Sequence, residues 1–271
     1  MSELRAAALE ALAISDPRSR CEAVRALSPA SALDALGSLV PVRPVPGRPA
    51  RPRLVAPSQV PQRAVQSIEG RAAMLHAVAH IEFNAIGLAL DAIWRFARMP
   101  DQFYFDWLRV AHEETLHYTL LADHLATLGY SYGDFDAHDG LWEMATRTQD
   151  DVLERMALVP RRLEARGLDA SPVVRSKLQA AGDAAGARLL DLILRDEIGH
   201  VAIGNRWFHW LCRQRCLDPG AADHDIAVRH GIPKPRGPFN VEARRSAGFS
   251  EEELGRLQRP AAAARAIPPP D

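Results

Sequence analysis

Two segments of the sequence pair a glutamate with a histidine three residues later, Glu114 with His117 and Glu197 with His200. On an α-helix, side chains three positions apart lie on one face, so each pair can hold a single metal ion. Apolar residues recur at helical spacing on the face that carries each pair, which predicts that both pairs are buried. Because a buried carboxylate is costly unless it is paired or bound to a metal, the two pairs predict a metal site.

A further glutamate precedes each pair at nearly the same interval, since Glu82 lies 32 residues before Glu114 and Glu164 lies 33 residues before Glu197. A ferritin-like four-helix bundle supplies one glutamate from each of two helices and Glu-x-x-His from each of the other two. The chain follows this order twice, which predicts a site for two metal ions. Its six predicted ligands are Glu82, Glu114, His117, Glu164, Glu197 and His200.

The ligand from the third helix has an alternative. Arginines stand on both sides of Glu164, a pattern that is also typical of a surface ion pair, and Glu154 lies ten residues earlier. Either glutamate therefore remains open as the third-helix ligand.

The types of the predicted ligands indicate the metal. Four carboxylates and two neutral imidazoles balance two divalent cations, and a ligand set without thiolates favours iron, with manganese as the alternative. Six protein ligands leave open positions where dioxygen could bind. Glu113 and Asp196 each precede the glutamate of a pair, and we expect each to accept a hydrogen bond from the ligand histidine of the neighbouring helix.

The composition is that of an ordinary globular protein. The 271 residues are 47% apolar and 25% charged with a formal net charge of -1, which gives no global argument for a nucleic-acid or membrane partner. The odd number of cysteines, three, favours reduced thiols. The N-terminus lacks the pattern of a signal peptide and no long uncharged apolar segment follows, so we expect a cytoplasmic protein with no membrane contact.

The pattern along the chain predicts an all-α protein, because helical spacing recurs and strand-like alternation does not. We expect an N-terminal helical extension over 1–40, a proline-rich linker or surface strap over 41–61, a ferritin-like four-helix bundle over 62–215 and a mostly irregular C-terminal extension over 216–271. The four long helices are expected at 62–98, 101–128, 141–166 and 183–215, with a short helix after 172 and another near 251–258.

Two local features qualify this division. Pro160 is expected to kink the third helix one turn before Glu164. The polar loop 132–140, between the second and third helices, is equally compatible with a lid and with a well-capped turn.

Several segments, among them AHIEFNAIGLALDAIWRF, AHEETLHYTLLADHL and LRDEIGHVAIGNRWF, resemble a bacterial ferritin-like family of unknown function and of the diiron-carboxylate type. The resemblance runs from about residue 50 to 255. More distantly, the spacing is similar to that of the tRNA-modifying diiron monooxygenase that hydroxylates an isopentenyl-type adenosine. The resemblance implies the fold and the dimetal site, and the reaction only loosely, because a fold does not fix a function.

These observations lead to one main functional hypothesis and two alternatives. The main one is an oxidoreductase that uses dioxygen to oxidise or hydroxylate an unknown small molecule, with electrons from an external donor because the sequence has no flavin or dinucleotide fingerprint. The alternatives are a non-catalytic iron-handling protein, which would normally form a cage, and a hydroxylase of tRNA. The sequence does not decide the oligomeric state, and a homodimer is one of the states that it leaves open. Arginines that could contact phosphates are Arg51, Arg53, Arg63, Arg161, Arg162 and Arg166.

Overall fold

The computed structural model describes residues 3–259, and most of these are helical. Within this range the one β pairing is an isolated bridge between Leu54 and Ala137. The all-α class predicted from the sequence is therefore confirmed. The α-helices are α1 (Leu4–Leu12), α2 (Pro17–Arg25), α3 (Ile68–Arg95), α4 (Asp101–Thr127), α5 (Gly140–Arg147), α6 (Val152–Leu158), α7 (Ala165–Ala180), α8 (Ala184–Gln214), α9 (Pro219–Arg229), α10 (Val241–Ser246) and α11 (Glu251–Gln258).

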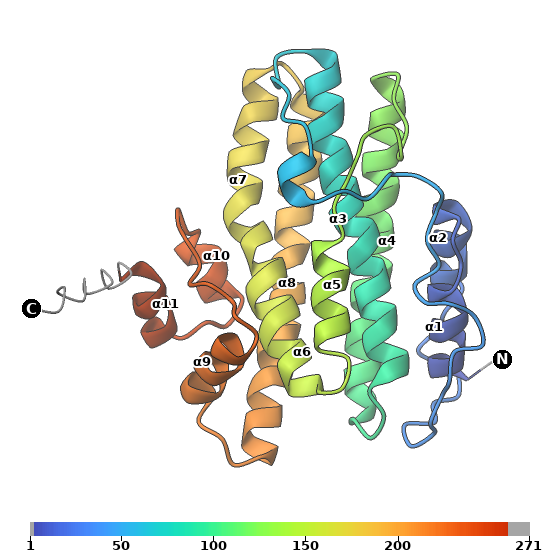
Figure 1. The fold of residues 1–271 in the computed structure, drawn as a ribbon, viewed down its shortest axis with the longest axis vertical. Coiled ribbons are helices and arrows are strands. Elements are labelled where there is room, and N and C mark those ends of the chain that lie inside the picture. The colour runs from blue at the N-terminus through green and yellow to red at the C-terminus, as the bar shows by residue number, and fades with distance from the viewer. Residues whose placement is uncertain (1–2, 260–271) are drawn as a thin grey trace, which may run out of the picture.

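Four long helical segments form the central bundle, and Figure 1 shows them running side by side along the long axis of the molecule. They are α3, α4, the continuous segment from α6 to α7, and α8. The closest partners are α3 with α4 and α7 with α8, and α4 also packs against α8. The two segments that carry Glu-x-x-His thus lie next to each other.

The ends of these helices follow the local sequence. Ser67 accepts a hydrogen bond from the backbone N–H of Gly70 and so caps the start of α3, while Asp183 caps α8 in the same way through Gly186. Pro100 separates α3 from α4. Gly129, which adopts a φ of 82°, ends α4 where the sequence predicted a stop.

The third long segment differs from its prediction. The expected helix over 141–166 is divided, because α5 ends at Arg147 and a new helix begins at Val152, capped by Asp151. A π-helical turn over Val159–Glu164 then replaces the expected kink at Pro160. Proline cannot donate the regular backbone hydrogen bond, and a wider turn accommodates its ring without ending the helix.

The expected break after residue 166 is also wrong, since α7 continues through Pro172 to Ala180. A proline inside a helix costs about 3 kcal/mol. Burial of a leucine side chain contributes about 1.5–3 kcal/mol, and α7 fully buries both Leu168 and Leu178. Packing therefore outweighs the local preference of Pro172.

The N-terminal helices and the proline-rich segment pack onto the bundle. Helices α1 and α2 lie against α3 and α4, and the proline-rich segment crosses the face of the bundle between α2 and α3 (Figure 1). This segment is a strap fixed to the loop 132–140, because the backbone N–H of Val55 donates to the Ala137 carbonyl and Arg53 pairs with Asp136 at 2.5 Å.

The C-terminal extension holds more helix than expected. Besides α11 it contains α9 and α10, and residues of α10 and α11 share a small second core with α7 and α8. The terminal PPPD, assigned from the sequence to this extension, lies outside the described residues. The three cysteines are all unpaired thiols.

Helix α3 is long and apolar enough to cross a membrane by length and composition alone, although the sequence was expected to hold no such segment. In the structure, however, 67% of its most apolar stretch is buried. The apolar character of α3 is therefore explained by its place as a core helix of the bundle.

Candidate metal centre

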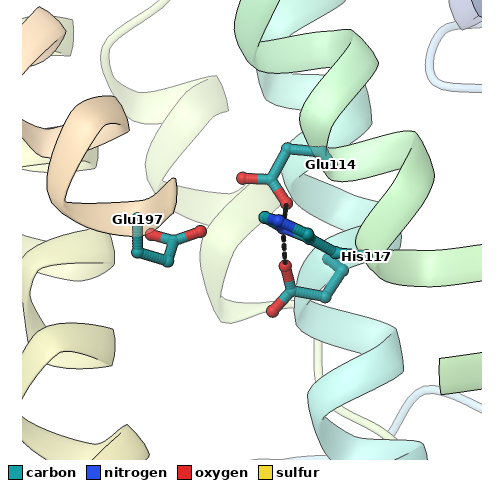
Figure 2. Close-up of side chains that lie close together, drawn as sticks. Glu114, His117 and Glu197 are labelled. Atoms are coloured by element: carbon teal, nitrogen blue, oxygen red, sulfur yellow. Dashed lines mark hydrogen bonds and ion pairs between the residues drawn. The ribbon is translucent and has the colours of Figure 1, made fainter. Parts of the chain in front are cut away.

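A cluster of acidic and imidazole side chains lies in the middle of the bundle. Glu82 comes from α3, Glu114 and His117 from α4, and Glu197 from α8, and one ligand atom from each lies within 4.8 Å of all the others. All four side chains are buried. Figure 2 shows Glu197 directing its carboxylate from α8 toward Glu114 and His117 on α4. The structure therefore brings four of the six predicted ligands into one group.

His200, a fifth predicted ligand, joins this group through its Nδ1 atom. That atom lies 3.0 Å from Oε1 of Glu114 and 3.2 Å from Oε1 of Glu197. On the other side, Nδ1 of His117 lies 3.2 Å from Oε2 of Glu82 and 3.4 Å from Oε2 of Glu114. The carboxylate of Glu114 thus lies between the two histidines.

The outer nitrogen of each histidine contacts a carboxylate of the opposite helix. Nε2 of His117 lies 3.1 Å from Asp196 on α8, and Nε2 of His200 lies 2.8 Å from Glu113 on α4. These are the two cross-helix contacts expected from the sequence. A proton held on Nε2 by these carboxylates leaves Nδ1 free to bind a metal, and it fixes the orientation of each ring.

Two arginines hold these outer carboxylates in place. Arg109 donates to Glu113 at 2.9 Å and Arg195 donates to Asp196 at 2.8 Å. Burial opposes ionisation of Asp196, but the hydrogen bonds from Arg195 and His117 outweigh it and lower its pKa. Sequence reasoning missed both arginines. Their spacing was the available signal, because Arg109 is one helical turn before Glu113 and Arg195 directly precedes Asp196.

Glu164 is the glutamate of the third segment that faces the cluster. Its Oε2 atom is fully enclosed although part of the residue reaches the surface, and burial together with the charges of Glu197 and Glu114 raises its pKa to about 8. Glu154 lies elsewhere, paired with Arg229 and, at 2.7 Å, with His230.

The charges of the cluster fit bound cations. Oε2 of Glu114 and Oε2 of Glu164 are buried and accept no hydrogen bond within the described residues. Burial and the neighbouring charge of Glu114 raise the pKa of Glu82 to about 8. Burial would lower the pKa of His117, but the carboxylates of Glu114 and Glu82 outweigh it and raise that pKa to about 11. Buried carboxylate oxygens without hydrogen-bond donors are the atoms that a divalent cation would bind in place of protons.

Neighbouring histidines and tyrosines point away from the cluster. Nε2 of His112 bonds to the Val24 carbonyl, and His80 bonds to the hydroxyl of Tyr132 at 2.9 Å. Tyr118 packs against Tyr132 with ring centroids 5.3 Å apart. These residues therefore belong to the outer layer over α3 and α4.

Two comparisons with known proteins give a match. A family model described as a protein of unknown function (DUF455) matches residues 13–255. A protein of Haemophilus influenzae, described as an uncharacterized protein, is 51% identical over 229 residues, which cover 82% of this chain and 80% of the relative. No solved structure gives a significant match.

Proposed function

The chain belongs to DUF455, a family of unknown function, and we propose from its buried cluster that it is a ferritin-like diiron oxidoreductase that uses dioxygen on an organic substrate. The observation that carries the proposal is the position of Glu114 between Nδ1 of His117 and Nδ1 of His200. One carboxylate shared by two histidines suits two adjacent metal ions better than one.

The side chains divide into two half-sites. Glu82 and His117 would hold one ion, Glu197 and His200 would hold the other, and Glu114 would contact both. Glu164 would complete the second half-site. When bound, two iron ions would supply the one-electron chemistry with dioxygen that protein side chains lack, and manganese is the alternative metal.

The chain itself contributes shielding, orientation and charge balance. The buried position of the cluster keeps bulk water away from it, and Asp196 and Glu113 hold the two imidazoles in the form that exposes Nδ1. The side chains of Glu113 and Asp196, which are 25% and 14% exposed, also connect these histidines to the surface. An external electron donor is part of the proposal and would approach from this side.

Metal content tests the proposal directly. Protein reconstituted with ferrous iron without oxygen should bind about two ions per chain, and admission of oxygen should change its optical spectrum and consume oxygen. Glu114→Ala and Glu197→Ala should lose most of the iron, whereas Glu154→Ala, a change in the same helical segment as Glu164, should retain it. Binding of less than about one ion per chain, or no response to oxygen, contradicts the proposal.

Two alternatives have distinct outcomes. Iron storage would give a large closed shell in sedimentation and far more than two ions per chain. A hydroxylase of tRNA would bind tRNA at low salt, but four of the six arginines named for this role are already paired, namely Arg53, Arg63, Arg161 and Arg162. Among residues 3–259, no contact favours either alternative over a small-molecule oxidoreductase.

A further inference from the structure

A cavity of about 290 Å³ lies between the proline-rich strap and α3. Phe83, Tyr132 and Trp142 give it aromatic walls, and His80 and Asn84 supply polar groups. Its size is close to the lower limit for small-molecule sites, and its mixture of aromatic walls with a few polar groups is typical of such sites.

This cavity is separate from the metal cluster. His80, Asn84 and Gly87 lie one helical turn apart on α3, and Glu82 points to the opposite side of the same helix. A molecule in the cavity would contact the outer face of α3 and the strap, and it would not contact the metal ligands.

Arg20 of α2 is a buried cation in the wall of this cavity. Only 2% of its surface is exposed, and its guanidinium stacks on the ring of Phe83 with 4.5 Å to the centroid. Nε donates to the Ile14 carbonyl at 3.0 Å, and Nη2 donates to carbonyls of Leu12, Ile14 and Gly47. Nη1 has no hydrogen-bond acceptor among the described residues.

The position of Gly87 shows where Nη1 lies. A Cβ atom added at Gly87, in the cavity wall, would lie 3.8 Å from Nη1 of Arg20 and 3.7 Å from Trp142. The unpartnered nitrogen is therefore directed to the part of the cavity that Gly87 leaves open.

The charge of Arg20 has no counter-ion in the part of the chain that the structure describes. No carboxylate there lies within 4.0 Å of its guanidinium, and the cavity residues Arg48 and Arg53 are paired with Asp139 and Asp136. Burial raises the pKa of Tyr132 and that of the Cys21 thiol, so both of these neighbours stay neutral. A buried charge without a counter-ion is destabilising, and an anionic ligand would offset this cost.

Arg5 shows that burial alone does not leave a nitrogen unpartnered. It is 1% exposed, and Nε, Nη1 and Nη2 all donate to backbone carbonyls. Arg5 is not among the residues that line the cavity beside Arg20. The difference between the two arginines is the cavity itself.

We propose that this cavity binds a small organic anion, an aromatic carboxylate of one or two rings, with the carboxylate on Nη1 of Arg20 and the rings against Phe83, Tyr132 and Trp142. The flat aromatic walls favour a planar body, and the single unpartnered nitrogen favours one negative charge. This inference does not depend on the proposed diiron chemistry.

The test compares two probes of equal shape, 2-naphthoate and the neutral 2-naphthamide, by calorimetry on the full-length protein. The carboxylate should bind saturably and at least about tenfold more tightly than the amide, because only the anion balances the charge of Arg20. Equal affinity for the two probes, or no saturation up to about 10 mM, overturns the proposal. Inorganic phosphate that binds more tightly than 2-naphthoate overturns the assignment of an aromatic ligand.

Gly87→Ala locates the site without unfolding the protein. The added Cβ would meet Leu12, Trp142 and Arg20 at 3.6–3.8 Å, which is ordinary contact, and alanine is favoured over glycine within a helix. We therefore expect unchanged or higher thermal stability together with severalfold weaker binding of 2-naphthoate. The matched control is Gly167→Ala in α7, where an added Cβ meets nothing within 4 Å, and it should bind normally. Equal affinity in both variants places the ligand elsewhere and overturns the assignment.

Discussion

The Nε2 atom of His117 on α4 lies 3.1 Å from Oδ2 of Asp196 on α8, while Nδ1 of the same ring faces the buried carboxylates of Glu82 and Glu114. The two nitrogens of one imidazole ring therefore face different environments. One contacts Asp196, which is 14% exposed, and the other faces the proposed metal site. His200 and Glu113 repeat this arrangement in the opposite direction between the same two helices.

Replacement of Asp196 by asparagine should weaken metal binding while the fold persists. The amide keeps the size of the side chain but lacks the charge that orients His117, and loss of such an outer partner typically lowers metal affinity about 10–100-fold. Competition with a chelator measures the change. Asp191→Asn is the control, because Asp191 is exposed on the same helix and pairs with Arg175. Equal affinity in the two variants would show that Asp196 does not support the metal site.

The stability of the metal-free protein should fall as pH rises from about 5 to about 9. The pKa of Glu82 and that of Glu164 are raised from 4.5 to about 8, and the pKa of His117 is raised from 6.5 to about 11. The folded state therefore holds protons that the unfolded chain releases, and their stabilisation is lost as pH rises through these values, by an amount on the order of a few kcal/mol.

Urea unfolding at a series of pH values measures this trend. Addition of manganous ion should reverse its sign, because a metal competes with protons for the same ligands and binds more tightly as pH rises. A urea midpoint that does not change with pH in the absence of metal would contradict the proton binding by Glu82, Glu164 and His117. A midpoint that manganese does not change would contradict the metal site.

The pairing of glutamate with histidine in the buried cluster could be predicted from the sequence because each pair lies within one helical turn. Glu114 and His117 are three residues apart, so their shared face follows from helix geometry alone. The same reasoning did not decide whether Glu154 or Glu164 is the ligand from the third helix. Only the course of the third segment separates them, and that course depends on a π-helical turn and on packing between distant residues. Local propensity does not contain this information.

The cavity beside Arg20 lay beyond sequence reasoning for a similar reason. Its walls come from α2, the strap, α3 and the segment around Tyr132 and Trp142, and nothing in their spacing indicates that they meet. Proline-rich composition predicted a strap or a linker and no specific contact. Long-range packing decides where such a segment lies.

Gly204→Ala should destabilise the protein by about 1–3 kcal/mol, although alanine favours helices. A Cβ at Gly204 on α8 would lie 2.3 Å from Cβ of Pro160 and 2.5 Å from its Cγ, and the proline ring cannot rotate away. The clash would displace the π-helical turn that carries Glu164, so bound iron should also decrease. Gly255→Ala, where an added Cβ meets nothing within 4 Å, is the matched control. A stability equal to that of the control would contradict the close approach.

Asp91→Asn should be among the most destabilising single changes outside the metal cluster. Asp91 is fully buried on α3 and pairs with Arg155 of α6, which is 2% exposed, and with Arg95 at 2.7 Å. Loss of one partner leaves a buried cation uncompensated, which costs about 3–5 kcal/mol, whereas Asp191→Asn at the exposed pair with Arg175 should cost less than about 1 kcal/mol.

Chemical denaturation of the Asp91→Asn/Arg155→Met double variant separates charge from packing. If the unpaired guanidinium causes the loss, removal of Arg155 as well should restore part of the stability, so the double variant should unfold at higher denaturant than additivity predicts. Arg155 also donates to Thr148 and to the Ala145 carbonyl, and these lost bonds limit the recovery. Strict additivity of the two single changes would show that Asp91 and Arg155 contribute independently, and that their ion pair does not hold α6 against α3.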